Sequence, residues 1–164
     1  MSDPSLQRIF DRLYRDLARD TLIQTTTEQL RKSLHADRVV LYYFYYKWSG
    51  KVTFESLSDD KFSILGTSGP DECFNGEYAK LYEDGRVRAI ADIESEPIQP
   101  CHRDFLHQLE VKANLVVPIL IDRGLWGLLV AHNCQSTYTW SSDEIMAMQT
   151  GAGNLAKIRS IQES

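Results

Sequence analysis

The sequence lacks an apolar run long enough to cross a membrane, and its N-terminus lacks a targeting signal. A spanning helix needs about 20 consecutive, mostly apolar residues, and no stretch of this chain approaches that length. The first residues, MSDPSLQRIF, do not show the basic and then apolar pattern of a signal peptide. We therefore expect a cytoplasmic domain without membrane contact, in a compartment where thiols stay reduced.

Cysteine is scarce, which weakens two structural roles for it. The chain has 3 cysteines, an odd number that fits poorly with a disulfide framework. Neither Cys73 nor Cys101 belongs to a CxxC pair, and the adjacent Cys101 and His102 do not have the spacing of zinc ligands. We predict no metal site.

Signals for nucleotide and nucleic-acid binding are also missing. The net charge of −5 argues against a general nucleic-acid or anionic-membrane surface. The chain contains no GxGxxG, no GxxxxGK[ST] and no HExxH motif. These absences disfavour a dinucleotide-binding enzyme, a P-loop enzyme and a zinc protease.

The remaining composition is that of one ordinary globular domain. The chain has 164 residues, of which 43% are hydrophobic and 25% charged. This length suits a single domain over residues 1–164 with a sizeable core. We find no internal repeat and no low-complexity segment.

Both ends of the chain have helical patterns. Apolar residues from Leu6 to Leu17 recur at spacings of three and four, which predicts an amphipathic helix, and a second helix is expected over about 25–34. Near the C-terminus, Ser141 followed by Glu144 is a capping-box pattern that opens a helix over 141–161.

Two pairs of strands are predicted between these helices. Residues 37–56 are rich in β-branched and aromatic side chains and are broken near Gly50, which predicts two strands and a turn. Residues 113–121 and 125–133 are apolar and flank a turn at Gly124, which predicts a buried hairpin.

The section between the strand pairs is expected to carry loops and short helices. We predict a loop over 58–76, a short helix over 76–86 that Gly85 ends, and an extended piece over 87–93. A helix over 102–111 follows Cys101. The element order indicates an α+β fold with a central antiparallel sheet, terminal helices on one face and a pocket roofed by loops and short helices on the other.

The residues alone leave the role of the cysteines open. Cys101 precedes a predicted helix whose positive end can lower the pKa of its thiol, as in a nucleophilic enzyme, but His102 can equally well cap or pack. Asp71 follows a proline in a loop and is typical of turn chemistry. A single histidine in an apolar strand, such as His132, is more often a hydrogen-bonded core residue than a functional one, and Cys134 is expected to be a small, partly buried side chain.

Three phrases of the sequence together resemble a known family. They are CHRDFLHQLEVKANLVVPILIDRGLWGLLVAHN at 101–133, DRVVLYYFYYKWSGKVTFES at 37–56, and DECF at 71–74. The chain resembles a GAF domain and, within that family, a cyanobacteriochrome, which is a bilin-binding photosensor. The resemblance covers about residues 20–160, and DECF is similar to the Asp-x-Cys-Phe motif of the two-cysteine subgroup.

The resemblance implies a covalent linear tetrapyrrole, phycocyanobilin or phycoviolobilin, as the cofactor. It implies that Cys101 attaches ring A permanently and that His102 lies against the bilin. It also implies that Cys73 adds reversibly to the central methine bridge, and that Asp71 accepts hydrogen bonds from pyrrole N–H groups.

Further contacts to the bilin are implied for other positions. Phe74 is expected to pack on the chromophore and His132 to lie near ring D or a propionate. Arg88 or Arg86 is expected to bind a propionate, because arginine suits bidentate recognition of carboxylates.

The implied function is light sensing, with no turnover of a diffusible substrate. A second thioether interrupts the conjugation of the bilin and leaves violet or blue absorption, and isomerisation of the bond between rings C and D breaks or reforms that thioether. The terminal helices are expected to pass the change to an output domain of a parent protein, and they are candidates for a homodimer contact. Alternatives are a GAF-type thiol redox enzyme that reduces free methionine sulfoxide, and a regulatory GAF domain that binds a small ligand.

Overall fold

The computed structural model describes residues 4–46, 48–69 and 76–164. Asp71, Cys73 and Phe74 therefore lie outside the described residues. The helices are α1 (Pro4–Arg19), α2 (Thr21–Ser33), the 3-10 turn η1 (Asp60–Phe62), α3 (Gly76–Glu83), α4 (Pro100–Gln108), α5 (Ser142–Leu155) and α6 (Arg159–Gln162). The strands are β1 (Arg38–Tyr46), β2 (Ser49–Leu57), β3 (Arg88–Ile90), β4 (Ala113–Ile121) and β5 (Gly124–Asn133).

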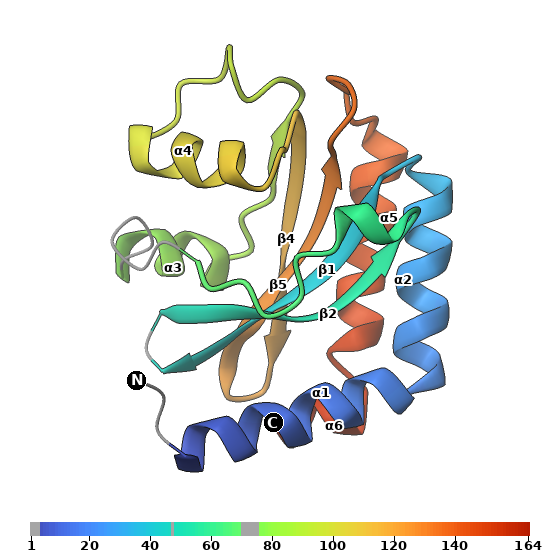
Figure 1. Cartoon of the computed structure of the whole chain (residues 1–164), viewed down its shortest axis with the longest axis vertical. Helices are drawn as coiled ribbons and strands as arrows, with labels where there is room; N and C mark the ends of the chain where they lie inside the picture. Colours follow the sequence, from blue (N-terminus) through green and yellow to red (C-terminus); the bar gives the residue numbers. More distant parts are fainter. Residues whose placement is uncertain (1–3, 47, 70–75) are drawn as a thin grey trace.

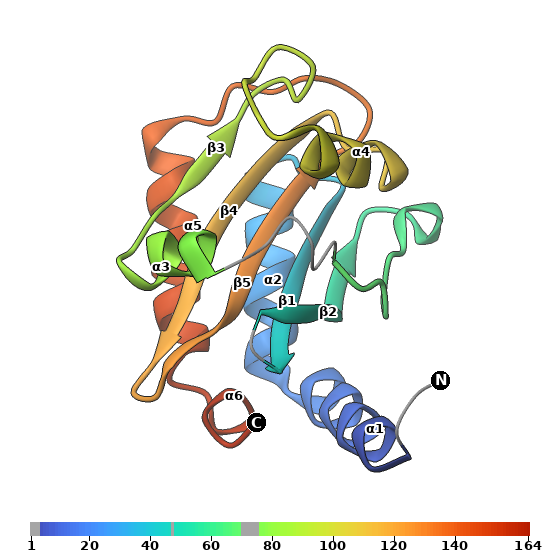
Figure 2. The ribbon, with the colours of Figure 1, turned by 90° about the vertical axis from the view of Figure 1, so that its left-hand side faces the viewer.

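The strands form one antiparallel sheet in the order β2-β1-β5-β4-β3. Helices α2 and α5 cover one face of this sheet, and α3 and α4 lie over the opposite face (Figures 1 and 2). The predicted α+β fold with a central antiparallel sheet is confirmed. The terminal helices are divided, however, because α1 and α6 lie together at one end of the sheet while α2 and α5 cover the face.

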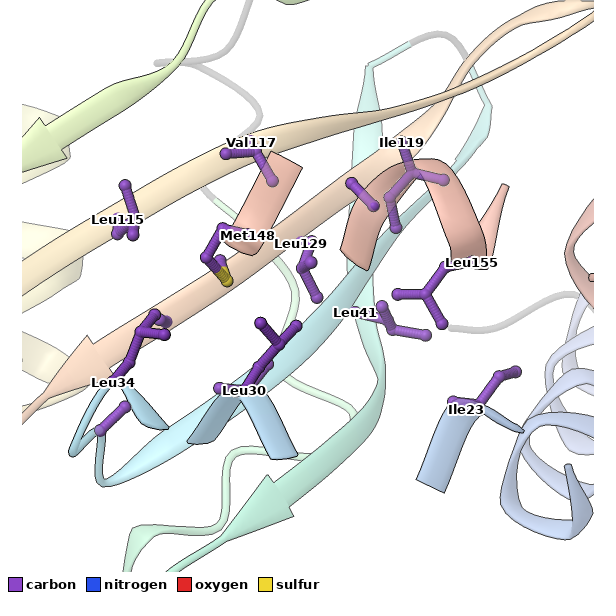
Figure 3. Packing of buried hydrophobic residues seen from close by; sticks show 14 of the residues in the cluster. Ile23, Leu30, Leu34, Leu41, Leu115, Val117, Ile119, Leu129, Met148 and Leu155 are labelled. Carbon is purple, nitrogen blue, oxygen red and sulfur yellow. The ribbon is translucent and has the colours of Figure 1, made fainter. Parts of the chain in front are cut away.

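The main core lies between the sheet and helices α2 and α5. Leu115, Val117 and Leu129 point from β4 and β5 toward Met148 and Leu155 of α5 (Figure 3). All five side chains are fully buried. Since successive strand residues point to opposite faces, the residues between them belong to the other side of the sheet. We call these two sides the helix face and the pocket face.

Helix boundaries differ from the prediction where a capping group decides them. Helix α2 begins at Thr21, earlier than the predicted residue 25, because the Asp20 carboxylate accepts hydrogen bonds from the backbone N–H groups of Leu22 and Ile23. The helix stops before His35, whose φ of 54° lies in the left-handed region.

The C-terminal helix has the predicted start but an earlier end. The Ser141 side chain accepts from the Glu144 backbone N–H, and Glu144 accepts in return from the Ser141 N–H, which confirms the capping box. The helix predicted to run to 161 ends at Leu155, because Ile158 is extended, and α6 follows as a separate short helix.

Helix α4 begins one residue before Cys101, whereas the sequence placed the cysteine just ahead of the helix. Pro100 occupies the first turn, where its missing N–H costs no hydrogen bond. Cys101 therefore lies inside the first turn of α4. Among the residues that the structure describes, no helix is both long and apolar enough to cross a membrane.

Candidate functional site

Two neighbouring cavities lie on the pocket face. The first measures about 100 Å³ and has a mainly apolar lining. The second measures about 320 Å³ and is lined by polar and charged groups, including Arg86 and Arg88. Tyr82 and His102 line both cavities. Pockets for drug-sized ligands usually hold about 300–1,000 Å³, so a large ligand would have to extend through both.

The strands and helix α4 together build the apolar cavity. Its lining includes Val40, Val116 and Val130 from three neighbouring strands, and Phe105 and Leu106 from α4. These valines alternate along their strands with the residues of the helix-face core. The same strands thus supply a packed core on one side and an apolar floor on the other.

Tyr42 lies in this cavity because glycines leave space for its ring. A Cβ on Gly50 would lie 2.1 Å from the Tyr42 ring, and a Cβ on Gly69 would lie 1.7 Å from its hydroxyl oxygen. No real Cβ makes such contacts, so both positions depend on the missing side chain.

Helix α4 brings the Cys101-His102 pair to the junction of the cavities. Cys101 is exposed in the first turn of this helix. Burial lowers the pKa of His102, and the nearby charges of Arg88 and Arg86 lower it further. His102 is therefore held neutral at physiological pH beside a cluster of positive charge.

Arg88 and Arg86 make the second cavity suitable for anionic groups. Arg88 Nη2 lies 3.6 Å from the Glu96 carboxylate, and the two side chains are only partly exposed. The Arg86 guanidinium lies 5.7 Å from the centre of the Tyr82 ring and 6.0 Å from that of Tyr78. Guanidinium groups bind carboxylates through paired hydrogen bonds, so both arginines can hold a ligand carboxylate here.

Three polar residues form a row across the pocket face. Arg38 of β1 pairs directly with His132 of β5, and His132 pairs directly with Asn114 of β4. Arg38 and Asn114 are each 2% exposed and His132 is 4% exposed. Buried polar groups need hydrogen-bond partners, so the partners of each residue show which of its polar atoms are already satisfied and which could bind a ligand.

Arg38 connects the sheet to the elements that roof the pocket. Its Nε donates to His132 Nδ1 at 2.9 Å, its Nη1 to the Phe62 carbonyl at 2.9 Å and its Nη2 to the Leu109 carbonyl at 2.6 Å. Leu109 is the C-cap residue that follows α4, and the helix dipole favours a cation at this end of the helix. Arg38 thus fixes η1 and α4 over the sheet.

The other two residues of the row line the apolar cavity. Burial, together with the charge of Arg38, keeps the pKa of His132 well below its ordinary value, so the ring is neutral. Asn114 Oδ1 is buried and has no hydrogen-bond partner among the described residues. An acceptor in this position costs free energy until a donor reaches it.

These features fit a linear tetrapyrrole. Such a bilin has an extended apolar body, propionate groups and several N–H donors. The apolar cavity suits the rings, the arginines suit the propionates, and the orphaned Asn114 oxygen suits an N–H group. The site therefore has the donor and acceptor types that the cofactor would need.

The structure brings together five of the residues predicted from the sequence. Cys101, His102, His132, Arg86 and Arg88 all belong to the pocket face or its roof. His132 is the hydrogen-bonded buried residue that one alternative predicted, and it also lines the apolar cavity, while its contact with a bilin stays a prediction.

Sequence reasoning did not find Arg38 and Asn114. The sequence did hold a signal for them. Each is a polar residue two positions before a cavity-lining valine of the same strand, so it points to the same face of the sheet. Cys134 is half-buried, as predicted.

Comparison with known proteins decides the family. The model of the GAF domain matches residues 18–158. The chain belongs to the GAF domain family. A curated relative from Picosynechococcus, described as an uncharacterized protein, is 49% identical over 156 residues, which cover 95% of this chain and 96% of that protein. A putative methyl-accepting chemotaxis protein of Synechocystis is 38% identical, and the match covers 77% of this chain but 13% of that protein.

Solved GAF structures agree with this assignment. The crystal structure of the cyanobacteriochrome receptor PixJ has a TM-score of 0.77 and 32% identity, over 87% of this chain and 93% of that one. A phycocyanobilin-bound GAF domain from a cyanobacterial phytochrome has a TM-score of 0.73 and 30% identity, over 90% and 91% of the two chains. The first of these structures is a cyanobacteriochrome receptor and the second is a bilin-bound phytochrome domain, which fits the prediction of a sensory GAF domain that is not an enzyme.

Proposed function

We propose that this GAF domain is a light sensor that binds a linear tetrapyrrole covalently. The observation that carries the proposal is the position of Cys101 and His102, on the helix that joins an apolar cavity to an arginine-lined one. The similarity to PixJ and to a phycocyanobilin-bound GAF domain supports it. When bound, the bilin supplies visible absorption and a double bond between rings C and D that light isomerises.

Each residue has a specific role in this proposal. The Cys101 thiol adds to the ethylidene group of ring A, so that a C–S bond forms and the thiol proton passes to the bilin without any oxidation. His102 lies against the pyrrole nitrogens, and its depressed pKa keeps it neutral there. Arg88 and Arg86 hold the propionates.

The second thiol and its neighbours belong to the same proposal. Cys73 adds reversibly to the central methine bridge, which shortens the conjugated system and leaves violet or blue absorption. Asp71 accepts hydrogen bonds from pyrrole N–H groups, and Phe74 packs on the chromophore. All three residues lie outside the described part of the chain, so the DECF motif alone supports their roles.

Expression with and without phycocyanobilin biosynthesis tests the function. The purified, reduced protein should carry a pigment that survives denaturing electrophoresis, seen by zinc fluorescence, and its absorption should change reversibly under blue or violet light. Absence of covalent pigment from reduced protein would overturn the proposal.

Substitutions of the two cysteines separate their roles. Cys101→Ala should abolish covalent attachment. Cys73→Ala should keep the pigment and lose the short-wavelength state, while Cys134→Ala serves as the control thiol. An unchanged spectrum in Cys73→Ala would remove the second thioether from the mechanism. Acid denaturation of the pigment distinguishes phycocyanobilin from phycoviolobilin by its absorption.

The signal is proposed to leave through the terminal helices, to an output domain of a parent protein in the cytoplasm. Trp126 of β5 donates from Nε1 to the Ser164 hydroxyl at 2.7 Å, and Arg123 in the β4–β5 turn donates to the Gln162 carbonyl at 2.6 Å. These bonds join the sheet under the pocket to the C-terminal residues. Hydrogen exchange of α1 and α6 should therefore differ between the two light states, and sedimentation would show whether a homodimer forms.

A further inference from the structure

The buried pair Asn114 and His132 provides an acceptor and a donor side by side in the apolar cavity. We propose that Asn114 binds the N–H group of a lactam ring of the ligand beside the His132-bound C=O group, and that Arg38 is a positioning residue that holds His132 in the required tautomer. This inference rests on the proposed bilin-binding function and adds two residues to it.

The case for Asn114 begins with its orphaned oxygen. Oδ1 is fully buried, lies in a residue that lines the cavity, and has no partner among the described residues. Nearly all buried acceptors in proteins are satisfied, so an unsatisfied one in a ligand cavity is a candidate for contact with a donor on the ligand. A ligand N–H group would remove the cost of this orphan.

The case for His132 depends on the direction of one hydrogen bond. Arginine donates and cannot accept, so the bond from Arg38 Nε makes His132 Nδ1 the acceptor. The ring is neutral, and its one proton is therefore on Nε2. His132 consequently offers an N–H donor as its second hydrogen-bonding group.

The register of the sheet brings the two groups together. Asn114 and His132 are directly paired across β4 and β5, and such pairs have Cβ atoms about 4.5–5.5 Å apart on one face. A lactam has an N–H next to a C=O, which matches an acceptor next to a donor. A carboxylate has only acceptors, and the Asn114 oxygen would repel it. The pair therefore selects a lactam over a propionate, and ring D is the lactam left when ring A is attached to Cys101.

The surrounding charges preserve this arrangement. Burial of the His132 ring, and after it the positive charge of Arg38, lowers the pKa of His132, so a second proton on the ring is disfavoured. Burial lowers the pKa of Arg38, and the smaller opposing influences come from Cys134, Glu55, Asp37 and Glu110. The guanidinium donates its hydrogen bonds to His132 and to the carbonyl groups of Phe62 and Leu109.

Nitrogen NMR of the histidines in the reduced protein without pigment tests the tautomer directly. His132 should show a protonated Nε2 and an unprotonated Nδ1 that persist from pH 7.5 to 5.5. Arg38→Met should give a mixture of tautomers, and Arg38→Lys should restore the single form because its ammonium can donate to Nδ1. A protonated Nδ1 in the wild type, or an unchanged spectrum in Arg38→Met, would overturn the role of Arg38. The wild-type spectrum decides the point even if Arg38→Met does not fold.

Thermal unfolding and pigment binding test Asn114. Asn114→Leu removes the orphaned acceptor, so the protein without pigment should melt about 2–4 °C higher. In a background with both Cys101→Ala and Cys73→Ala, where the pigment binds without a thioether, Asn114→Leu should weaken phycocyanobilin binding about 10-fold. Asn114→Asp keeps an acceptor in either protonation state and should restore most of the affinity, whereas the exposed Asn154→Leu is the control.

The outcomes separate this inference from the proposed function. If Asn114→Leu binds phycocyanobilin as tightly as its parent while wild-type protein still attaches pigment, the lactam contact is wrong and the function stands. If Asn114→Asp behaves like Asn114→Leu, the amide acts as a donor and the inference also fails. If wild-type protein attaches no pigment, the function itself is wrong, and the tautomer result still describes the row.

Discussion

The two faces of the sheet use the same strands for opposite purposes. On the helix face, Leu115, Val117 and Leu129 are fully buried in one continuous apolar core. On the pocket face, the apolar residues form smaller separate clusters around cavities, and Arg38, His132 and Asn114 cross them as a polar row. The packed core of the helix face stabilises the fold, whereas the cavities and buried polar groups of the pocket face lower its stability and form a binding site.

The largest expected contrast comes from neighbouring valines of β4. Val117→Ala on the helix face should lower the free energy of unfolding by about 2–3 kcal/mol, because it removes two methyl groups and leaves a cavity. Val116→Ala on the pocket face should cost about 1 kcal/mol, because that side chain already borders a cavity. Chemical denaturation measures both. Equal losses would show that the two faces are packed alike and would break the comparison.

A pH titration of stability examines the polar row. His132 stays neutral in the folded state, whereas in the unfolded chain it takes up a proton below about pH 6.5. The unfolded state then binds more protons, so stability should fall as the pH drops below that value, by up to about 1.4 kcal/mol per pH unit for this one proton.

His132→Gln keeps an acceptor for Arg38 and should reduce this slope. His102→Gln should remove a second contribution of the same sign, since its pKa is also depressed. The exposed His107→Gln is the comparison variant. An unaltered slope in His132→Gln would mean that the histidine is not held neutral by the fold.

The cap of α5 tests how far the helix face depends on its covering helix. Ser141→Ala removes the side chain that accepts from the Glu144 N–H and should cost about 1 kcal/mol in thermal or denaturant unfolding. The neighbouring Ser142→Ala is exposed, lies in the first turn and should change stability by less than about 0.5 kcal/mol. Similar losses for both serines would show that the capping box contributes little.

The smallest expected effect concerns the close contact between α5 and α2. Gly153→Ala meets no neighbouring atom and should stabilise the domain by about 0.5–1 kcal/mol through helix propensity. Gly151→Ala would bring its Cβ to 2.7 Å from Leu30 Cδ1, so its gain should be smaller or reversed. A larger gain at Gly151 than at Gly153 would contradict the tight packing of the helix face.

The sequence predicted the strands well because their patterns are local. The hairpin over 113–121 and 125–133 is confirmed with its turn at Gly124, whose φ is 120°. The boundaries of α2 and α4 were less accurate, because Asp20 and Pro100 act through capping geometry rather than through apolar spacing. The split of the C-terminal helix after Leu155 had no clear signal beyond its glycines.

The sequence predicted only those residues of the candidate site that belong to a recognisable motif. The CHRDF phrase indicated Cys101 and His102, and the structure places both on α4 at the edge of the cavities. The roles of Asp71, Cys73 and Phe74 remain predictions from the DECF motif. Arg38 and Asn114 belong to no motif, and their importance follows from pairing across strands that are far apart in the chain.

The sequence by itself determined the fold class and the family resemblance, and it indicated Cys101 as the candidate attachment residue. Local propensity and periodicity suffice for the first, and residue identity suffices for the others. Only the tertiary structure decided which residues share the pocket face and which hydrogen bonds they make. The reason is that the strand register places Arg38, His132 and Asn114 in one row. Because these residues are buried, the hydrogen bond between Arg38 and His132 and the unsatisfied oxygen of Asn114 determine which ligand groups the row can bind.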